Sequence, residues 1–247
     1  MESTILPFAA PHPGDTLSLL SSLVEVDPDV LARERILPPG AAGVNGGAYK
    51  MLRTQVLRRL DKQGANSLAI IGTAPGTGKT LTAINLAIAI AAESQRTALL
   101  VDLDLRNPSV HKRLGIEPRI GIEDCLRRES PLREAMLRPV GYERLVVLPA
   151  RERCEDSSEL LSSRRTQDVI EELRQRYADR IIVFDLPPVL RADDALAFAR
   201  HVQACLIVVG EGQTKRDDLT RTIELLRDLP ILGTVLNGSR ERVDAYY

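Results

Sequence analysis

A glycine-rich loop that ends in Lys79 and Thr80 is the part of the sequence with the clearest chemistry. It follows a short apolar run and precedes residues with helical spacing, which is the order of a phosphate-binding P-loop. Its backbone N–H groups can turn toward phosphate oxygens, because glycine leaves no side chain in the way. Lys79 would reach the β- and γ-phosphates of a nucleotide, and the Thr80 hydroxyl would ligate Mg²⁺. The residues expected to hold the nucleotide phosphates are Ala74, Pro75, Gly76, Thr77, Gly78, Lys79 and Thr80.

Three carboxylates stand at the ends of two further apolar runs. Asp102 and Asp104 end the run ALLVDLDLR, and Asp185 ends the run IIVFDLPP. Strand alternation places Asp102 and Asp104 on one side, near the strand end at which open parallel sheets bind ligands. An aspartate in the place of Asp185 commonly holds Mg²⁺ through water beside a P-loop. Asp102 could also accept the proton of an attacking hydroxyl. The alternative interpretation is that each carboxylate only caps a loop.

The elements that would position these residues are short apolar runs that alternate with helical patterns. Continuous runs such as IIVF and CLIVV indicate strands buried on both faces of a sheet. We therefore predict an α/β fold with a doubly wound, mainly parallel sheet and helices on both faces. The strands are expected at residues 68–72, 97–103, 145–149, 181–185, 205–209 and 231–236. The helices are expected at residues 48–62, 78–94, 110–114, 122–127, 132–137, 158–177, 194–200 and 217–229.

The chain divides into three regions by composition. Residues 1–45 contain closely spaced prolines and glycines, which predict an extended N-terminal arm with one short helix at 17–24. This arm is either a mobile leader or a segment that packs on the domain or on a neighbour. Residues 46–238 form one α/β domain, and residues 239–247 form a short, flexible C-terminal tail.

Composition excludes several classes of protein. The 247 residues include 33 Lys and Arg against 34 Asp and Glu, so bulk charge does not favour nucleic acid as a partner. No apolar run reaches the roughly 18 to 20 residues that a bilayer requires, and no secretory signal is visible. The cysteines are too few and too scattered for a disulfide framework or a zinc site, which favours a reducing cytoplasm. We expect them to pack in the core, and we expect His111 to lie at the surface.

The order and spacing of the three motifs resemble the bacterial tyrosine kinases of capsule and exopolysaccharide synthesis. These motifs are the P-loop, an apolar run with Asp-x-Asp-x-Arg, and an apolar run with Asp-x-Pro-Pro. Thr73 departs from the pattern, because it replaces the usual first glycine. The resemblance covers residues 48–237 and includes the segments AYKMLRT, DLRNPSVHKRLG, SSELLSSRR, DLPPVLRADDALAFAR and GTVLN.

The resemblance implies ATP- and Mg²⁺-dependent phosphorylation of tyrosine by a P-loop kinase domain at residues 46–238. It implies that the terminal Tyr246 and Tyr247 are phosphorylated in trans, with Arg106 or Arg53 as candidate phosphate contacts. Asn237 is expected to contact the adenine. The catalytic residues would be Lys79, Asp102, Asp104 and Asp185, and the Mg²⁺ site would consist of Thr80, Asp102 and Asp185.

The resemblance also implies partners. A chain of this length corresponds to the separate form of the kinase, which a transmembrane adaptor or polysaccharide co-polymerase would activate. The protein would then be cytoplasmic and peripheral at the inner face of the membrane, and a cognate tyrosine phosphatase would oppose it. A homo-oligomer is compatible with the sequence, although the ring motif is degenerate at its aligned positions Gly47, Lys50 and Arg53.

Two other functions compete with the kinase. A positioning ATPase of the Min and Par type shares the fold, but its signature lysine aligns with Ala74. The last nine residues, SRERVDAYY, are also too short and polar for a membrane-binding helix. The third interpretation is a subunit of a polysaccharide export complex that binds nucleotide without significant kinase activity.

Overall fold

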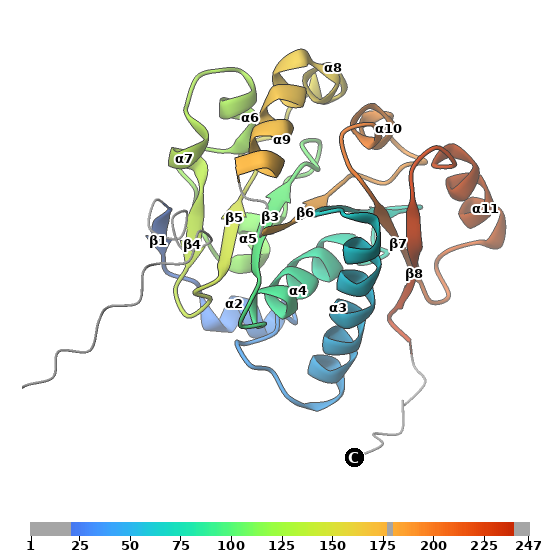
Figure 1. The fold of residues 1–247 in the computed structure, drawn as a ribbon, viewed down its shortest axis with the longest axis horizontal. Helices are drawn as coiled ribbons and strands as arrows, with labels where there is room; N and C mark the ends of the chain where they lie inside the picture. The colour runs from blue at the N-terminus through green and yellow to red at the C-terminus, as the bar shows by residue number, and fades with distance from the viewer. Residues whose placement is uncertain (1–20, 177–179, 240–247) are drawn as a thin grey trace, which may run out of the picture.

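The computed structural model describes residues 21–176 and 180–239, and its centre is an eight-stranded sheet (Figure 1). The strand order is β1-β4-β5-β3-β6-β2-β7-β8, and every neighbouring pair is parallel except β4 and β5. The strands are β1 (Ser22–Val24), β2 (Ser67–Gly72), β3 (Thr97–Asp102), β4 (Leu137–Pro139), β5 (Leu145–Leu148), β6 (Arg180–Asp185), β7 (Cys205–Gly210) and β8 (Ile231–Asn237). The predicted doubly wound α/β fold is confirmed.

Helices cover both faces of the sheet, because successive residues of each strand point to opposite sides. In β2, Leu68 and Ile70 pack in the core on one face, whereas Ala69 and Ile71 pack in the core on the other. The first face carries α3 (Gly43–Gln63), α4 (Lys79–Ala91) and α5 (Val110–Leu114). The second face carries α6 (Ile122–Leu126), α7 (Leu132–Ala135), α8 (Ser157–Ser162), α9 (Arg164–Arg176), α10 (Asp194–Ala199) and α11 (Arg216–Leu225).

The carboxyl ends of β2, β6 and β3 lie side by side. Parallel pairing aligns Ile70 of β2 with Asp185 of β6, and it aligns Asp185 with Asp102 of β3. The P-loop leaves β2 at this end of the sheet and enters α4. The fold therefore brings the loop and the carboxylates of the two other motifs to one place.

Residues 21–45 pack on the domain, which is one of the two alternatives for the arm, but they form a strand and a helix where an extended segment was expected. β1 pairs with β4 where a helix at 17–24 was expected, and residues 1–20 lie outside the described residues. The next helix, α2 (Pro28–Arg33), begins after Asp27, whose carboxylate accepts the N–H groups of Asp29 and Val30. Proline is favoured at the first position of a helix. Pro28 therefore begins α2, although the prolines of this segment were expected to prevent helices.

Two other predictions are wrong. The single helix expected at 158–177 is divided into α8 and α9 at Ser163, whose hydroxyl accepts the Thr166 N–H at 3.1 Å. Ser163 has extended backbone and therefore caps a new helix in place of continuing the old one. His111, expected at the surface, is buried in α5.

Candidate active site

Gly78 joins the P-loop to α4 and brings Asn237 against the loop. Gly78 has a φ of 90°, a left-handed conformation that favours glycine, and Lys79 begins the helix. A Cβ atom on Gly78 would lie 1.9 Å from the side-chain nitrogen of Asn237. That amide donates to the Thr77 carbonyl at 3.0 Å. Asn237 therefore lies beside the phosphate loop, while its contact with adenine stays a prediction.

Thr73 replaces the usual first glycine of the motif without backbone strain. Its φ is not positive, so the position has no need of glycine. The side chain is buried, and its hydroxyl lies 3.4 Å from that of Thr214. The departure from the motif therefore leaves the loop geometry intact.

A cleft of about 300 Å³ opens beside the loop. Its lining includes Lys79 and Thr80, together with Asp104 from the second motif. Three arginines from outside the P-loop also line it, namely Arg106, Arg113 and Arg191. Positive charge at the N-terminus of a helix is suited to a nucleotide polyphosphate. The cleft therefore unites the predicted phosphate-binding residues with one predicted catalytic carboxylate.

Asp102 is fully buried and bonded to the backbone. Its carboxylate accepts the N–H groups of Asp104 at 3.1 Å, Ser109 at 3.1 Å and Val110 at 3.0 Å. These contacts hold the turn after β3 and the start of α5, as in the loop-capping interpretation. Asp102 is not among the residues that line the cleft, whereas Asp104 is. The geometry therefore favours Asp104 as the carboxylate that meets an acceptor.

Asp185 fits a magnesium site. It is fully buried beside Asp102, and neither of its carboxylate oxygens is hydrogen-bonded to a described residue. Burial raises the pKa of Asp185 to about 7, and the nearby Thr80 hydroxyl, which lies outside hydrogen-bond geometry, and the Lys79 charge offset part of the rise. Burial and then the charge of Asp185 also raise the pKa of Asp102. A cation would lower both pKa values, and Mg²⁺ prefers oxygen donors such as Asp185 and Thr80.

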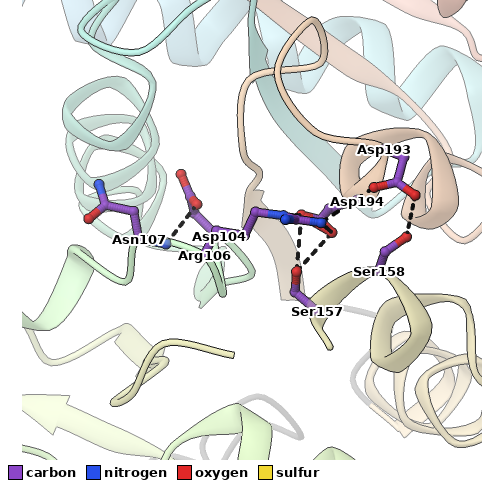
Figure 2. A network of polar contacts seen from close by, with 7 residues as sticks. All are labelled: Asp104, Arg106, Asn107, Ser157, Ser158, Asp193 and Asp194. Atoms are coloured by element: carbon purple, nitrogen blue, oxygen red, sulfur yellow. Dashed lines mark hydrogen bonds and ion pairs between the residues drawn. The ribbon is translucent and has the colours of Figure 1, made fainter. Parts of the chain in front are cut away.

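Arg106 connects the cleft to a network that the sequence did not predict (Figure 2). Its Nε donates to Asp194 at 2.5 Å, and its Nη2 donates to the same carboxylate at 3.2 Å. Asp194 is 1% exposed and also accepts the Ser157 hydroxyl at 2.9 Å. The adjacent aspartates at 193 and 194 were the available signal, but pattern alone does not show which arginine they meet.

Other predicted residues lie away from this cleft or outside the described chain. Arg53 donates to the Ala89 carbonyl at 3.3 Å and is not part of the cleft lining. Tyr246 and Tyr247 lie outside the described residues. All three cysteines are buried, as expected. Within the described residues no group of three His, Cys, Asp or Glu could hold a metal. None of the described helices is long and apolar enough to cross a membrane.

A family model described as ParA, NUBPL iron-transfer P-loop NTPase, matches residues 64–244. Among curated proteins, the tyrosine-protein kinase YwqD of Bacillus subtilis is 29% identical over 200 residues, covering 80% of this chain and 82% of YwqD. The tyrosine-protein kinase ptk of Acinetobacter johnsonii is 27% identical over 201 residues. That match covers 81% of this chain but 27% of ptk, so the chain spans about a quarter of that relative.

Solved structures give the same relationship. The chimerical protein CapA2B2 has a TM-score of 0.75 and 25% identity, covering 93% of this chain and all of that one. The VpsO kinase domain has a TM-score of 0.70 and 26% identity, and the match covers 85% of this chain and 97% of that domain. The cell division ATPase MinD of Pyrococcus furiosus has a TM-score of 0.60 and 26% identity, and the match covers 70% of this chain and 71% of MinD. The chain therefore belongs to the ParA-like P-loop NTPases, and within them it is similar to bacterial tyrosine kinases.

Proposed function

We propose that this chain is an ATP- and Mg²⁺-dependent protein-tyrosine kinase that phosphorylates Tyr246 and Tyr247 of another copy. The observation that carries the proposal is the cleft shared by Lys79, Thr80 and Asp104, with the unpaired carboxylate of Asp185 beside it. The similarity to proteins named tyrosine-protein kinases supports tyrosine as the acceptor.

In this reaction the tyrosine oxygen attacks the γ-phosphorus of ATP. A new P–O bond forms, the bond to the β–γ bridging oxygen breaks, and ADP leaves. The phenolic proton passes to the carboxylate of Asp104, whose pKa is raised by burial and lowered less by Lys79. Lys79 balances charge on the phosphates. Thr80 and Asp185 would hold Mg²⁺, with the charge of Asp102 behind them, and the ion would neutralise phosphate charge.

The proposal extends to the setting of the kinase. A transmembrane adaptor or polysaccharide co-polymerase would activate the chain at the inner face of the membrane. A cognate phosphatase would remove the phosphates, and the cycle would regulate synthesis, chain length or export of a capsule or exopolysaccharide. What supports this setting is the similarity to YwqD and ptk, which are both named tyrosine-protein kinases.

The test is incubation of the purified chain with Mg-ATP, followed by intact mass and anti-phosphotyrosine detection. We expect the wild type to gain phosphate, and we expect Lys79→Met and a chain lacking Tyr246 and Tyr247 to gain none. The matched control is Lys62→Met, because Lys62 is an exposed lysine at the end of α3 and lies outside the cleft.

Two outcomes would redirect the proposal. Equal labelling of the chain without the terminal tyrosines would place the acceptor elsewhere. ATP hydrolysis without phosphotyrosine, including in the presence of a membrane partner, would favour a Min- and Par-type switch, whose fold MinD shares with this chain.

A further inference from the structure

Arg106, Asp194 and Ser157 tie three separate segments together beside the cleft (Figure 2). Arg106 lies on the turn after β3, Asp194 is the first residue of α10, and Ser157 is the first residue of α8. Arg106 and Asp194 are 88 residues apart in sequence, yet two hydrogen bonds join them. A two-point contact between a planar guanidinium and a carboxylate fixes orientation as well as distance.

The two partners differ in exposure. The Asp194 side chain is 1% exposed and the Arg106 side chain is 43% exposed. A buried carboxylate is unfavourable without partners, and here the Ser157 hydroxyl and Arg106 provide them. The network therefore has a fixed buried end at Asp194 and an accessible end at Arg106.

The hydrogen bonds leave part of the guanidinium free. Nε and Nη2 of Arg106 donate to Asp194, and Nη2 also lies 3.4 Å from Asp193. Nη1 donates to none of the described residues. Because Arg106 lines the cleft, this group is available to an anion bound there.

We propose that Asp194 is a positioning residue for phosphoryl transfer. It fixes Arg106 so that the free N–H groups contact the phosphoryl group as it passes from ADP to the tyrosine oxygen. Arg106 shares its turn with Asp104 and so acts from the acceptor side, whereas Lys79 acts from the P-loop. This inference rests on the proposed kinase function.

The test is a pair of double-mutant cycles on the full chain, with kcat and KM for ATP measured from phosphotyrosine formation. Arg106→Ala should lower kcat by about 100-fold, as for loss of a donor to a transition state. Asp194→Asn should lower kcat by about tenfold, with KM for ATP changed less than about twofold. The double variant should lose no more than Arg106→Ala alone, because Asp194 acts through Arg106.

A matched control and a milder variant keep the test independent of folding. Asp193→Asn removes an exposed contact with Arg106 at 3.4 Å and should change kcat by less than about twofold. Ser157→Ala keeps the ion pair and removes the hydroxyl that donates to both carboxylate oxygens of Asp194, at 2.9 and 3.2 Å. If Asp194→Asn does not fold, the change in kcat caused by Ser157→Ala tests the inference instead. That change should vanish when Arg106→Ala is also present.

The outcomes separate this inference from the proposed function. Independent, multiplicative losses in both cycles, or unchanged kcat with a lowered Tm, would assign the network to stability alone and overturn the inference. A wild type that forms no phosphotyrosine would overturn the kinase proposal, and the inference with it. An active wild type with a fully active, folded Asp194→Asn variant would overturn the inference alone.

Discussion

At the scale of single residues, Gly78 controls how closely Asn237 approaches the phosphate loop. A Cβ atom there would meet the Asn237 nitrogen at 1.9 Å, and φ is 90°. Gly78→Ala should weaken ADP binding at least tenfold, because both the loop and Asn237 must move. It should also lower the free energy of unfolding by about 1–3 kcal/mol through backbone strain. Calorimetric ADP titration and urea unfolding measure the two effects.

Gly212 provides the matched control for this prediction. Its φ is 68°, but nothing lies within 4 Å of an added Cβ atom. Gly212→Ala should therefore lower stability through strain while leaving ADP affinity within about twofold. Equal losses of ADP affinity in both variants would contradict a steric role for Gly78.

The pKa of Asp185 predicts how stability depends on pH when Mg²⁺ is chelated. The ordinary value of 3.8 applies to the unfolded chain, and burial raises the folded value to about 7. Between these values the folded chain holds a proton that the unfolded chain has released. The free energy of unfolding should therefore fall as pH rises from about 4 to about 7.

Asp185→Asn should make this fall smaller, because the amide does not titrate, while the raised pKa values of Asp102 and Asp104 still contribute to it. Urea unfolding across the pH range in EDTA measures the effect, with the exposed Asp228→Asn as control. Mg-ADP should stabilise the wild type more at the alkaline end, where the carboxylate is ionised. A wild type and an Asp185→Asn variant with equal slopes would contradict the raised pKa.

Sequence predicted the site residues that belong to local motifs. Lys79 and Thr80 follow from the loop pattern, and Asp104 and Asp185 follow from their places at strand ends. The capping role of Asp102 depends on the loop before α5, and the pairing of Asp194 depends on a residue 88 positions away. Contacts of this kind require the folded chain, because no spacing in the sequence encodes them.

At the scale of elements, Asn85 of α4 attaches the N-terminal segment to the P-loop helix. Its side chain accepts the Leu37 N–H at 2.8 Å and donates to the Arg35 carbonyl at 3.0 Å. Asn85 is 2% exposed, so its loss would leave the partly buried Leu37 N–H and Arg35 carbonyl without this partner. Asn85→Ala should lower the free energy of unfolding by about 2–4 kcal/mol.

Urea unfolding and limited proteolysis check this prediction. The segment around Arg33 and Arg35 should be cut by trypsin faster in Asn85→Ala than in the wild type. The control is Asn45→Ala, since Asn45 is exposed on α3 and should leave both properties unchanged. Unchanged stability in Asn85→Ala would mean that residues 35–37 are not anchored through this side chain.

The elements that sequence predicted well are those with strong local signals. β6 and β7 are continuous apolar runs, and their expected bounds are within one residue of those observed. β1 and β4 were not predicted, because Ser-Leu-Val and Leu-Arg-Pro are too short to show a pattern. β1 pairs with β4 across more than 100 residues, and β4 also pairs with β5.

At the scale of the whole molecule, the sheet topology determines where chemistry occurs. β6 lies between β3 and β2, so the ends of all three motif-bearing strands meet. The composition and the alternation of elements were sufficient to predict this architecture. They did not predict that residues 21–45 extend the sheet and cover the first face, because those contacts join distant segments.

The central claim is phosphoryl transfer between copies, and a mixture of two inactive chains tests it most directly. Lys79→Met keeps the terminal tyrosines but loses the P-loop lysine, whereas a chain lacking Tyr246 and Tyr247 keeps the cleft but loses the acceptors. Intact mass distinguishes the two chains after incubation together with Mg-ATP. We expect phosphate on the Lys79→Met chain in the mixture and on neither chain alone. Absence of phosphate from the Lys79→Met chain, under conditions in which the wild type is labelled, would contradict it.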